Sequence, residues 1–175
     1  MFHKPVLVEE VMVRLLGEPN GVYVDGTVGG GGHARAILKA LGPRGKLIAL
    51  DRDEEAIRHA KAQLKAFGNR LIVRKGNFKE FNRVLEELNI KRIHGLLLDL
   101  GVSSHQIDTA ERGFSYGTTG DLDMRMDQQQ DRTAGDIVNT WSEDELFRAF
   151  KAYGEERRSR AVARIIIKER KRTRI

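Results

Sequence analysis

The sequence predicts an α/β fold built on a parallel sheet, because short apolar segments alternate with longer amphipathic ones. The apolar segments are rich in Leu or β-branched residues and are too short for helices, so each is expected to be a buried strand. The expected strands are residues 21–25, 46–51, 70–74 and 93–99. The helices expected on both faces of the sheet are the amphipathic segments between the strands, residues 33–41, 53–67 and 78–88.

The chain beyond Asp99 shows a different pattern. Residues 101–120 are rich in Ser, Thr and Gly without a usable period, and we expect a long functional loop there. Helical signals then return: residues 142–145 form a capping box for a helix through about Tyr153, and a further helix is expected from Glu155 onward. The chain therefore reads as a core followed by a mainly helical part.

We place the core at residues 1–110 and the loop and helical insertion at residues 111–175. No strand signal follows Asp99, so an edge of the sheet would stay uncovered, and the chain looks like the first part of something larger.

Composition excludes several classes of protein. The 175 residues include no Cys, which removes disulfide scaffolds, thiolate nucleophiles, Cys-ligated zinc and iron–sulfur clusters. No apolar run approaches the roughly 20 residues of a membrane span, and the start of the chain lacks the pattern of a secretory signal. We expect a cytoplasmic protein that does not contact membranes.

The net charge of +6 is unevenly distributed along the chain. Residues 151–175 hold ten Lys or Arg and three Glu, a net charge of +7, so residues 1–150 carry a net charge of −1. This basic end is either a surface that binds RNA phosphates or a solvated helix face, and charge alone favours neither.

A glycine-rich loop, DGTVGGGGH at residues 25–33, joins the first expected strand to the first expected helix. Gly29, Gly31 and Ala34 fit the dinucleotide pattern G-x-G-x-x-A, and Asp51 follows Gly29 by 22 residues, near the spacing of a ribose-binding acid. A purely structural turn is the alternative. A nicotinamide dehydrogenase is a second alternative, and this glycine pattern is the only feature of the sequence that supports it.

Two acids end strands at the edge of the sheet where ligands bind. Asp51 can accept hydrogen bonds from both hydroxyls of a ribose; the alternative is a helix cap, but Asp53 can fill that role. Asp99 ends the fourth strand on the same edge, so we place it at the mouth of the same site.

Several short segments, in this order along the chain, resemble one bacterial family, the S-adenosylmethionine-dependent 16S ribosomal RNA cytosine-N4 methyltransferases. They are residues 3–11 (HKPVLVEEV), 24–27 (VDGT), 31–33 (GGH), 51–53 (DRD), 97–104 (LLDLGVSS), 111–115 (ERGFS), 122–127 (LDMRMD) and 153–157 (YGEER). Each motif is weak alone, but together and in register they are highly specific.

The resemblance implies a Rossmann-like class I methyltransferase fold with S-adenosylmethionine as cofactor and 16S ribosomal RNA of the small subunit as partner. The residues that it places against the cofactor are Gly31, Gly32, His33, Asp51, Phe78, Asp99 and Gln106. Asp99 is also the candidate catalytic residue, since a carboxylate near the cytosine amine stabilises the positive charge that develops there. The cytosine must be unstacked to react, which favours a single-stranded site.

The same comparison leaves some points open. His105 stands where relatives commonly have Pro, and family members continue for about as long again. A truncated, inactive fragment that binds only cofactor or RNA is therefore an alternative, and a homodimer is possible. A metal site is not expected, because Asp121, Asp123 and Asp127 fail the calcium-loop pattern.

Overall fold

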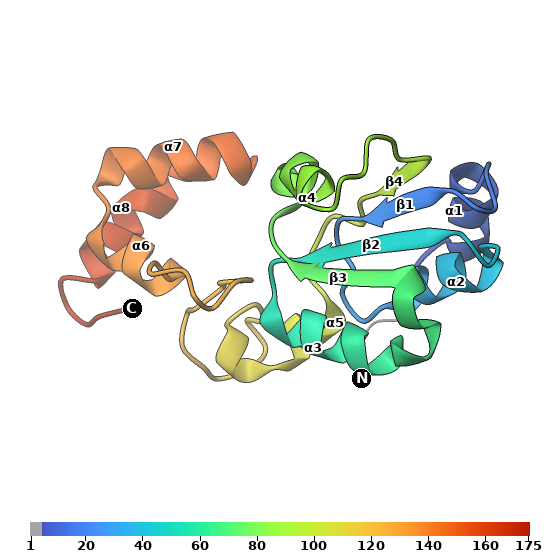
Figure 1. Cartoon of the computed structure of the whole chain (residues 1–175). Helices are drawn as coiled ribbons and strands as arrows, with labels where there is room; N and C mark the ends of the chain where they lie inside the picture. The colour runs from blue at the N-terminus through green and yellow to red at the C-terminus, as the bar shows by residue number, and fades with distance from the viewer. Residues whose placement is uncertain (1–4) are drawn as a thin grey trace. The chain divides into compact units, whose positions relative to one another are not determined.

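The computed structural model describes residues 5–175 (Figure 1). His3 and Lys4 of the first family motif lie outside the described residues. The chain divides into two compact units, the first ending at His105 and the second comprising Gln106–Ile175. No helix among the residues described is long and apolar enough to cross a membrane.

The first unit contains a four-stranded parallel sheet in the order β3-β2-β1-β4, which confirms the predicted α/β class. Its strands are β1 (Val22–Asp25), β2 (Lys46–Asp51), β3 (Leu71–Lys75) and β4 (Gly95–Leu97). The chain moves outward from β1 to β3 and then returns to place β4 on the other side of β1. This reversal is a topological switch point, and it lies between β1 and β4.

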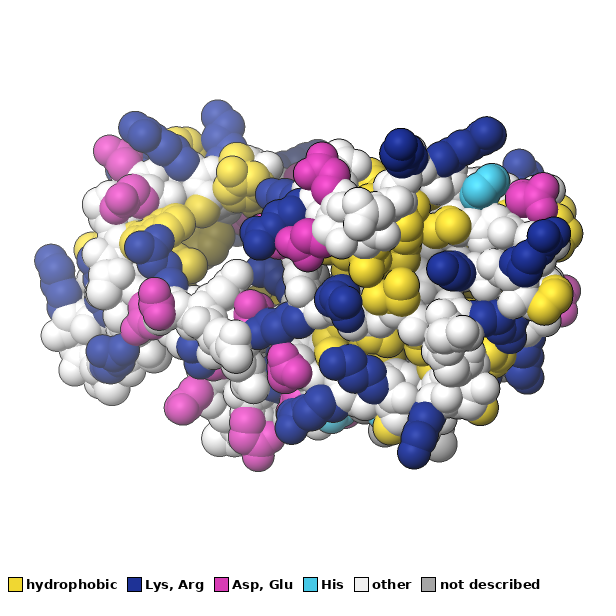
Figure 2. Space-filling view, in the orientation of Figure 1, with side chains coloured by type: hydrophobic (Ala, Val, Ile, Leu, Met, Phe, Trp, Pro, Cys, Tyr) yellow, Lys and Arg dark blue, Asp and Glu magenta, His cyan; other side chains and the backbone are white. Residues whose placement is uncertain are grey.

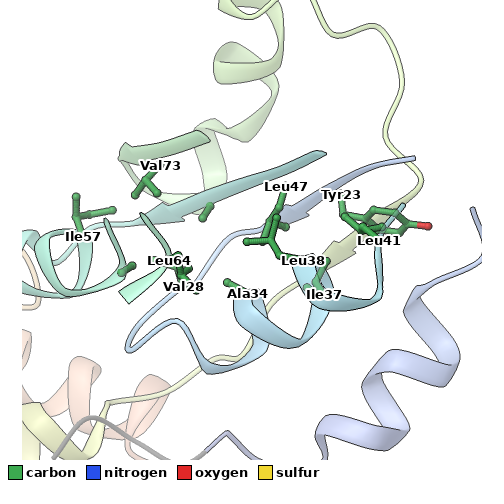
Figure 3. Packing of buried hydrophobic residues seen from close by; sticks show 12 residues of the cluster. Tyr23, Val28, Ala34, Ile37, Leu38, Leu41, Leu47, Ile57, Leu64 and Val73 are labelled. Atoms are coloured by element: carbon green, nitrogen blue, oxygen red, sulfur yellow. The ribbon is translucent and has the colours of Figure 1, made fainter. Parts of the chain in front are cut away.

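Helices cover both faces of the sheet (Figure 1). The apolar run of β2 is continuous because both faces of the strand are buried. Leu47 and Ala49 pack into one buried cluster, and Ile48 and Leu50 pack into another. The first cluster, drawn in Figure 3, includes α2 (Gly32–Ala40) and α3 (Glu54–Gln63). The second includes α4 (Phe81–Glu87).

Several boundaries differ from those expected. A helix not expected from the sequence, α1 (Val8–Leu15), precedes the sheet. The helix expected over residues 53–67 ends at Gln63 and continues as a 3-10 segment, Lys65–Arg70, in which Gly68 has φ 55°. The strand expected over residues 93–99 is only Gly95–Leu97.

The second unit is helical. It contains most of α5 (Ser104–Asp108), then α6 (Ala134–Thr140), α7 (Glu143–Tyr153) and α8 (Ser159–Glu169). The capping box at α7 is confirmed, since the Ser142 hydroxyl accepts from the Glu145 amide and the Glu145 carboxylate accepts from the Ser142 amide. The expected loop at residues 101–120 is partly wrong, because α5 and a 3-10 turn, Ala110–Arg112, lie within it.

Candidate functional site

The glycine loop after β1 is fixed to both neighbouring strands. The amide of Gly26 donates to the Leu97 carbonyl of β4 at 2.9 Å, and the amide of Val28 donates to the Leu50 carbonyl of β2 at 2.8 Å. Gly29 and Gly31 have φ of 48° and 81°, the left-handed region where glycine carries no steric cost. The loop therefore lies at the switch point, at the carboxyl ends of the strands.

Asp51, at the end of β2, holds this loop in place. Its Oδ2 accepts from the Gly29 amide and its Oδ1 from the Asp53 amide, each at 2.9 Å. Asp53 caps α3 by accepting from the Glu55 amide at 3.0 Å, as the sequence predicted. Burial raises the pKa of Asp51. Each oxygen of Asp51 has a further lone pair for a ligand hydroxyl.

Asp99 follows β4 and lies beside the same loop. Its amide donates to the Thr27 hydroxyl at 2.7 Å. Its carboxylate Oδ2 lies 3.7 Å from Nδ1 of His33, whose Nε2 is 2.9 Å from the Val6 carbonyl. The Asp99 side chain is 47% exposed whereas the His33 side chain is 9% exposed. Asp99 is therefore held by the loop and still accessible to a substrate.

The remaining predicted residues fall into two groups. Gly31 and Gly32 lie at the start of α2, and Phe78 follows β3 beside the loop, since a Cβ added at Gly26 would lie 3.0 Å from Phe78 Cβ. The structure thus places six of the seven predicted site residues at one end of the sheet. Gln106 belongs to the second unit, and its place at the cofactor stays a prediction.

Sequence reasoning missed Asp25, the last residue of β1. Its carboxyl group is 1% exposed; Oδ1 accepts from the Thr27 amide at 3.1 Å, and Oδ2 has no hydrogen-bond partner in the described part of the chain. Burial, and then the negative charges of Asp51 and Asp99, raise the pKa of Asp25 to about 7. Its position at the end of an expected strand, which Asp51 and Asp99 share, was the available signal.

The basic end contains cations with two different roles. Arg170 of the second unit donates from Nη1 to the carbonyls of Val138 and Trp141 at 2.9 and 2.7 Å, at the end of α6. Lys168 and Lys171 are exposed and form no ion pair within residues 5–175. Figure 2 shows Lys and Arg side chains spread over the visible face of both units, so the basic end is not the only basic surface.

Two other cations of the second unit stabilise its helix pairing. Arg160 of α8 lies 3.2 Å from the carboxylate of Asp144 and 4.1 Å from the ring centre of Phe147, both on α7. Arg164 lies 3.1 Å from Glu143, the first residue of α7. We therefore assign both arginines to the fold of this unit.

The acidic segment at residues 121–127 is also structural. Asp123 binds Arg125 through a 2.6 Å ion pair, which lowers the pKa of Asp123. Arg112, 1% exposed, donates to the carbonyls of Arg125 and Met126 at 3.0 Å. No group of three or more His, Asp or Glu side chains among the described residues could hold a metal ion.

Comparison with known proteins gives relatives that carry the same name. The chain is 54% identical over 168 residues to the ribosomal RNA small subunit methyltransferase H of Syntrophotalea carbinolica, and 53% identical over 168 residues to that of Geobacter sulfurreducens. Each alignment covers 96% of this chain and 54% of the relative, so the chain spans about half the length of the curated relatives it matches.

A partial structural likeness connects the chain to a SAM-dependent methyltransferase from Aquifex aeolicus. It covers 41% of this chain and 38% of that chain, with a TM-score of 0.37 and 24% identity. The family model of the MraW methylases matches residues 1–175, the whole chain. The chain belongs to the MraW methylase family.

Proposed function

We propose that this chain is the cofactor-binding part of a methyltransferase that moves a methyl group from S-adenosylmethionine to the N4 amine of a cytosine in 16S ribosomal RNA. The observation that carries the proposal is the meeting of the glycine loop, Asp51 and Asp99 at the carboxyl end of the sheet, beside its switch point. The names of the relatives support ribosomal RNA of the small subunit as substrate. Such a reaction takes place in the cytoplasm.

The residues present fit a cationic nucleoside ligand. Three carboxylates, Asp25, Asp51 and Asp99, surround a loop of bare peptide groups, and one buried oxygen of Asp25 lacks a partner within the described structure. A ligand that carries both ribose hydroxyls and a positive charge satisfies this set. When bound, S-adenosylmethionine supplies an electrophilic methyl group on a positively charged sulfur.

Different residues of the site bind different parts of the cofactor. Asp51 accepts from the ribose hydroxyls while it retains the Gly29 amide. Gly31, Gly32 and His33 form the start of α2, where the first backbone amides of a helix have no partner within the helix. Phe78 supplies an apolar surface beside the loop. Gln106 belongs to the second unit, and its role at the cofactor stays a prediction.

Asp99 orients the cytosine amine and stabilises the charge that forms on it. The amine is a poor nucleophile because its lone pair is conjugated with the ring, so alignment supplies much of the rate enhancement, as much as about 7–11 kcal/mol. The carboxylate accepts a hydrogen bond from the amine, and its negative charge stabilises the developing ammonium. The proton leaves afterward, because an ammonium of this kind is a strong acid.

Exposed cations of the second unit suit the RNA backbone. Lys168 and Lys171 are free of ion pairs within residues 5–175, whereas Arg170 is used by the fold. Neutralised phosphates release counterions, which adds affinity without reading sequence.

Cofactor choice is tested by calorimetric titration of the folded chain with S-adenosylmethionine and with NAD. We expect binding of S-adenosylmethionine and much weaker binding of NAD. Tighter binding of NAD, or no binding of either ligand, would refute the proposal.

Catalysis is tested in a chimera that continues this chain, after Ile175, with the remaining part of the Syntrophotalea carbinolica relative. We expect the chimera to methylate a cytosine amine in small-subunit RNA. The change Asp99→Ala should abolish transfer while the fold is retained, and Asp108→Ala, at an exposed position of α5, serves as the control. Transfer that survives Asp99→Ala would remove Asp99 from the chemistry.

A further inference from the structure

The buried carboxyl group of Asp25 differs from its two acidic neighbours in having an oxygen with no partner. The side chain is 1% exposed, and Oδ2 makes no hydrogen bond to any described residue. Leaving a buried polar atom unpaired is costly, so the few that occur in native proteins often mark a role other than stability. This atom lies at the carboxyl end of β1, within the proposed site.

Sheet register places Asp25 between the other two acids. Asp25 is paired with Ala49 of β2 on one side and with Leu97 of β4 on the other. Asp51 and Asp99 each lie two residues beyond these partners. Three carboxyl groups therefore follow one another across β2, β1 and β4, with Asp25 in the middle.

The charges acting on Asp25 come from both neighbouring strands. Asp51 from β2 and Asp99 from the segment after β4 both disfavour its ionisation, and the Thr27 amide is the hydrogen-bond donor that favours it. His33 lies against Asp99, with its Nδ1 3.7 Å from the Asp99 Oδ2. Burial and the two negative charges raise the pKa of Asp25 to about 7.

We propose that Asp25 senses the charge on the cofactor sulfur: the carboxyl group is protonated in the empty site and ionises when the cationic methyl donor binds. The inference rests on the proposed function and extends it. It assigns to Asp25 the discrimination between the charged donor and the neutral thioether that remains after methyl transfer.

The order of the three acids supports sulfur as the group that Asp25 meets. In the donor the sulfur is bonded to both the ribose-bearing carbon and the methyl group. If Asp51 holds the ribose and Asp99 holds the amine that receives the methyl group, the sulfur would lie between them, on the side of Asp25. A sulfonium has no N–H to donate, so the attraction is Coulombic, and it is strong because the carboxyl group is buried.

This coupling predicts a defined release of protons. A carboxyl group that titrates near pH 7 in the free protein and is ionised in the complex releases about 0.9 proton per bound donor at pH 6, about 0.5 at pH 7 and about 0.1 at pH 8. The same linkage makes the donor bind about tenfold more weakly at pH 6 than at pH 8. The thioether product, without charge on sulfur, should show much less of both effects.

The test is calorimetry of this chain with S-adenosylmethionine and with S-adenosylhomocysteine, in phosphate and in Tris buffer at pH 6, 7 and 8. The two buffers differ in ionisation enthalpy, so the difference in observed heat gives the number of protons released. We expect release with the methyl donor and less than half as much with the thioether. The Asp25→Asn protein should release none, and the Asp53→Asn protein, which keeps its capping oxygen, should behave as the wild type.

Equal release with both ligands, or tight binding of the donor without release, would overturn the inference and leave the proposed function standing. No binding of either ligand would overturn both. If the Asp25→Asn protein does not fold, the contrast between the two ligands in the wild-type protein still decides.

Discussion

Replacing Asp25 by Asn should stabilise the protein at neutral pH, because the buried carboxyl group is a cost to the folded state once it ionises. The folded chain raises the pKa of this group from 3.8 to about 7. Between those two values the folded protein holds a proton that the unfolded chain has lost. The free energy of unfolding should therefore be greatest below about pH 4, fall as pH rises toward 7, and level off above it.

The size of the effect follows from the shift in pKa. A change from 3.8 to about 7, at about 1.4 kcal/mol per pKa unit, corresponds to roughly 4 kcal/mol over the full range. Between pH 5 and pH 8 the expected loss of stability is roughly 2–3 kcal/mol. Asn has nearly the same shape and does not ionise, so this contribution should vanish in the Asp25→Asn protein.

Urea unfolding followed by circular dichroism at pH 5, 6, 7 and 8 measures the difference. The wild type should lose stability across this range relative to Asp25→Asn, and Asp53→Asn should follow the wild type. Parallel curves for wild type and Asp25→Asn would show that the carboxyl group titrates normally, and the reasoning from burial would then be wrong.

Three further results are expected. Asp51→Ala should weaken binding of S-adenosylmethionine by about 1.5–3 kcal/mol through loss of charge-assisted hydrogen bonds; unchanged affinity in calorimetry would make Asp51 only a holder of the loop. Arg170→Met should destabilise the second unit by about 1.5–3 kcal/mol, seen as a lower urea midpoint of Trp141 fluorescence, whereas Lys171→Met should not. Replacing Lys168 and Lys171 by Ala should lower the log–log salt slope of RNA binding by about one to two units; an unchanged slope would identify a solvated helix face.

The strands were predictable because both faces of the sheet are buried. Leu47, Ile48, Ala49 and Leu50 form one uninterrupted apolar run, and the structure buries all four. Helix α1 was not predicted: the Leu7 side chain makes no cap for it, and it contains no fully buried residue. Packing against other parts of the first unit stabilises such a helix, and these contacts cannot be predicted from the local sequence.

The site residues that could be predicted are those that lie at the ends of expected strands. Asp51 and Asp99 were found because each ends an expected strand, and the structure places both at the carboxyl end of the sheet, Asp51 as the last residue of β2 and Asp99 two residues after β4. Asp25 was read as part of the glycine loop. Its burial and its place between the other two acids depend on β4 lying beside β1, which strand order along the chain does not reveal.

The pairing of β1 with β4 also bears on how the protein folds. Tyr23 pairs with Gly95, and the Thr27 hydroxyl accepts from the Asp99 amide, 72 residues away in the chain. Contacts so distant in sequence form late, because the entropy of closing the loop is lost before the contact stabilises the chain. The pairings of β1 with β2 and β2 with β3 span much shorter stretches. The Asp51 side of the candidate site should thus be assembled before the Asp99 side, and the complete arrangement of the proposed site should be among the last features that the folding chain acquires.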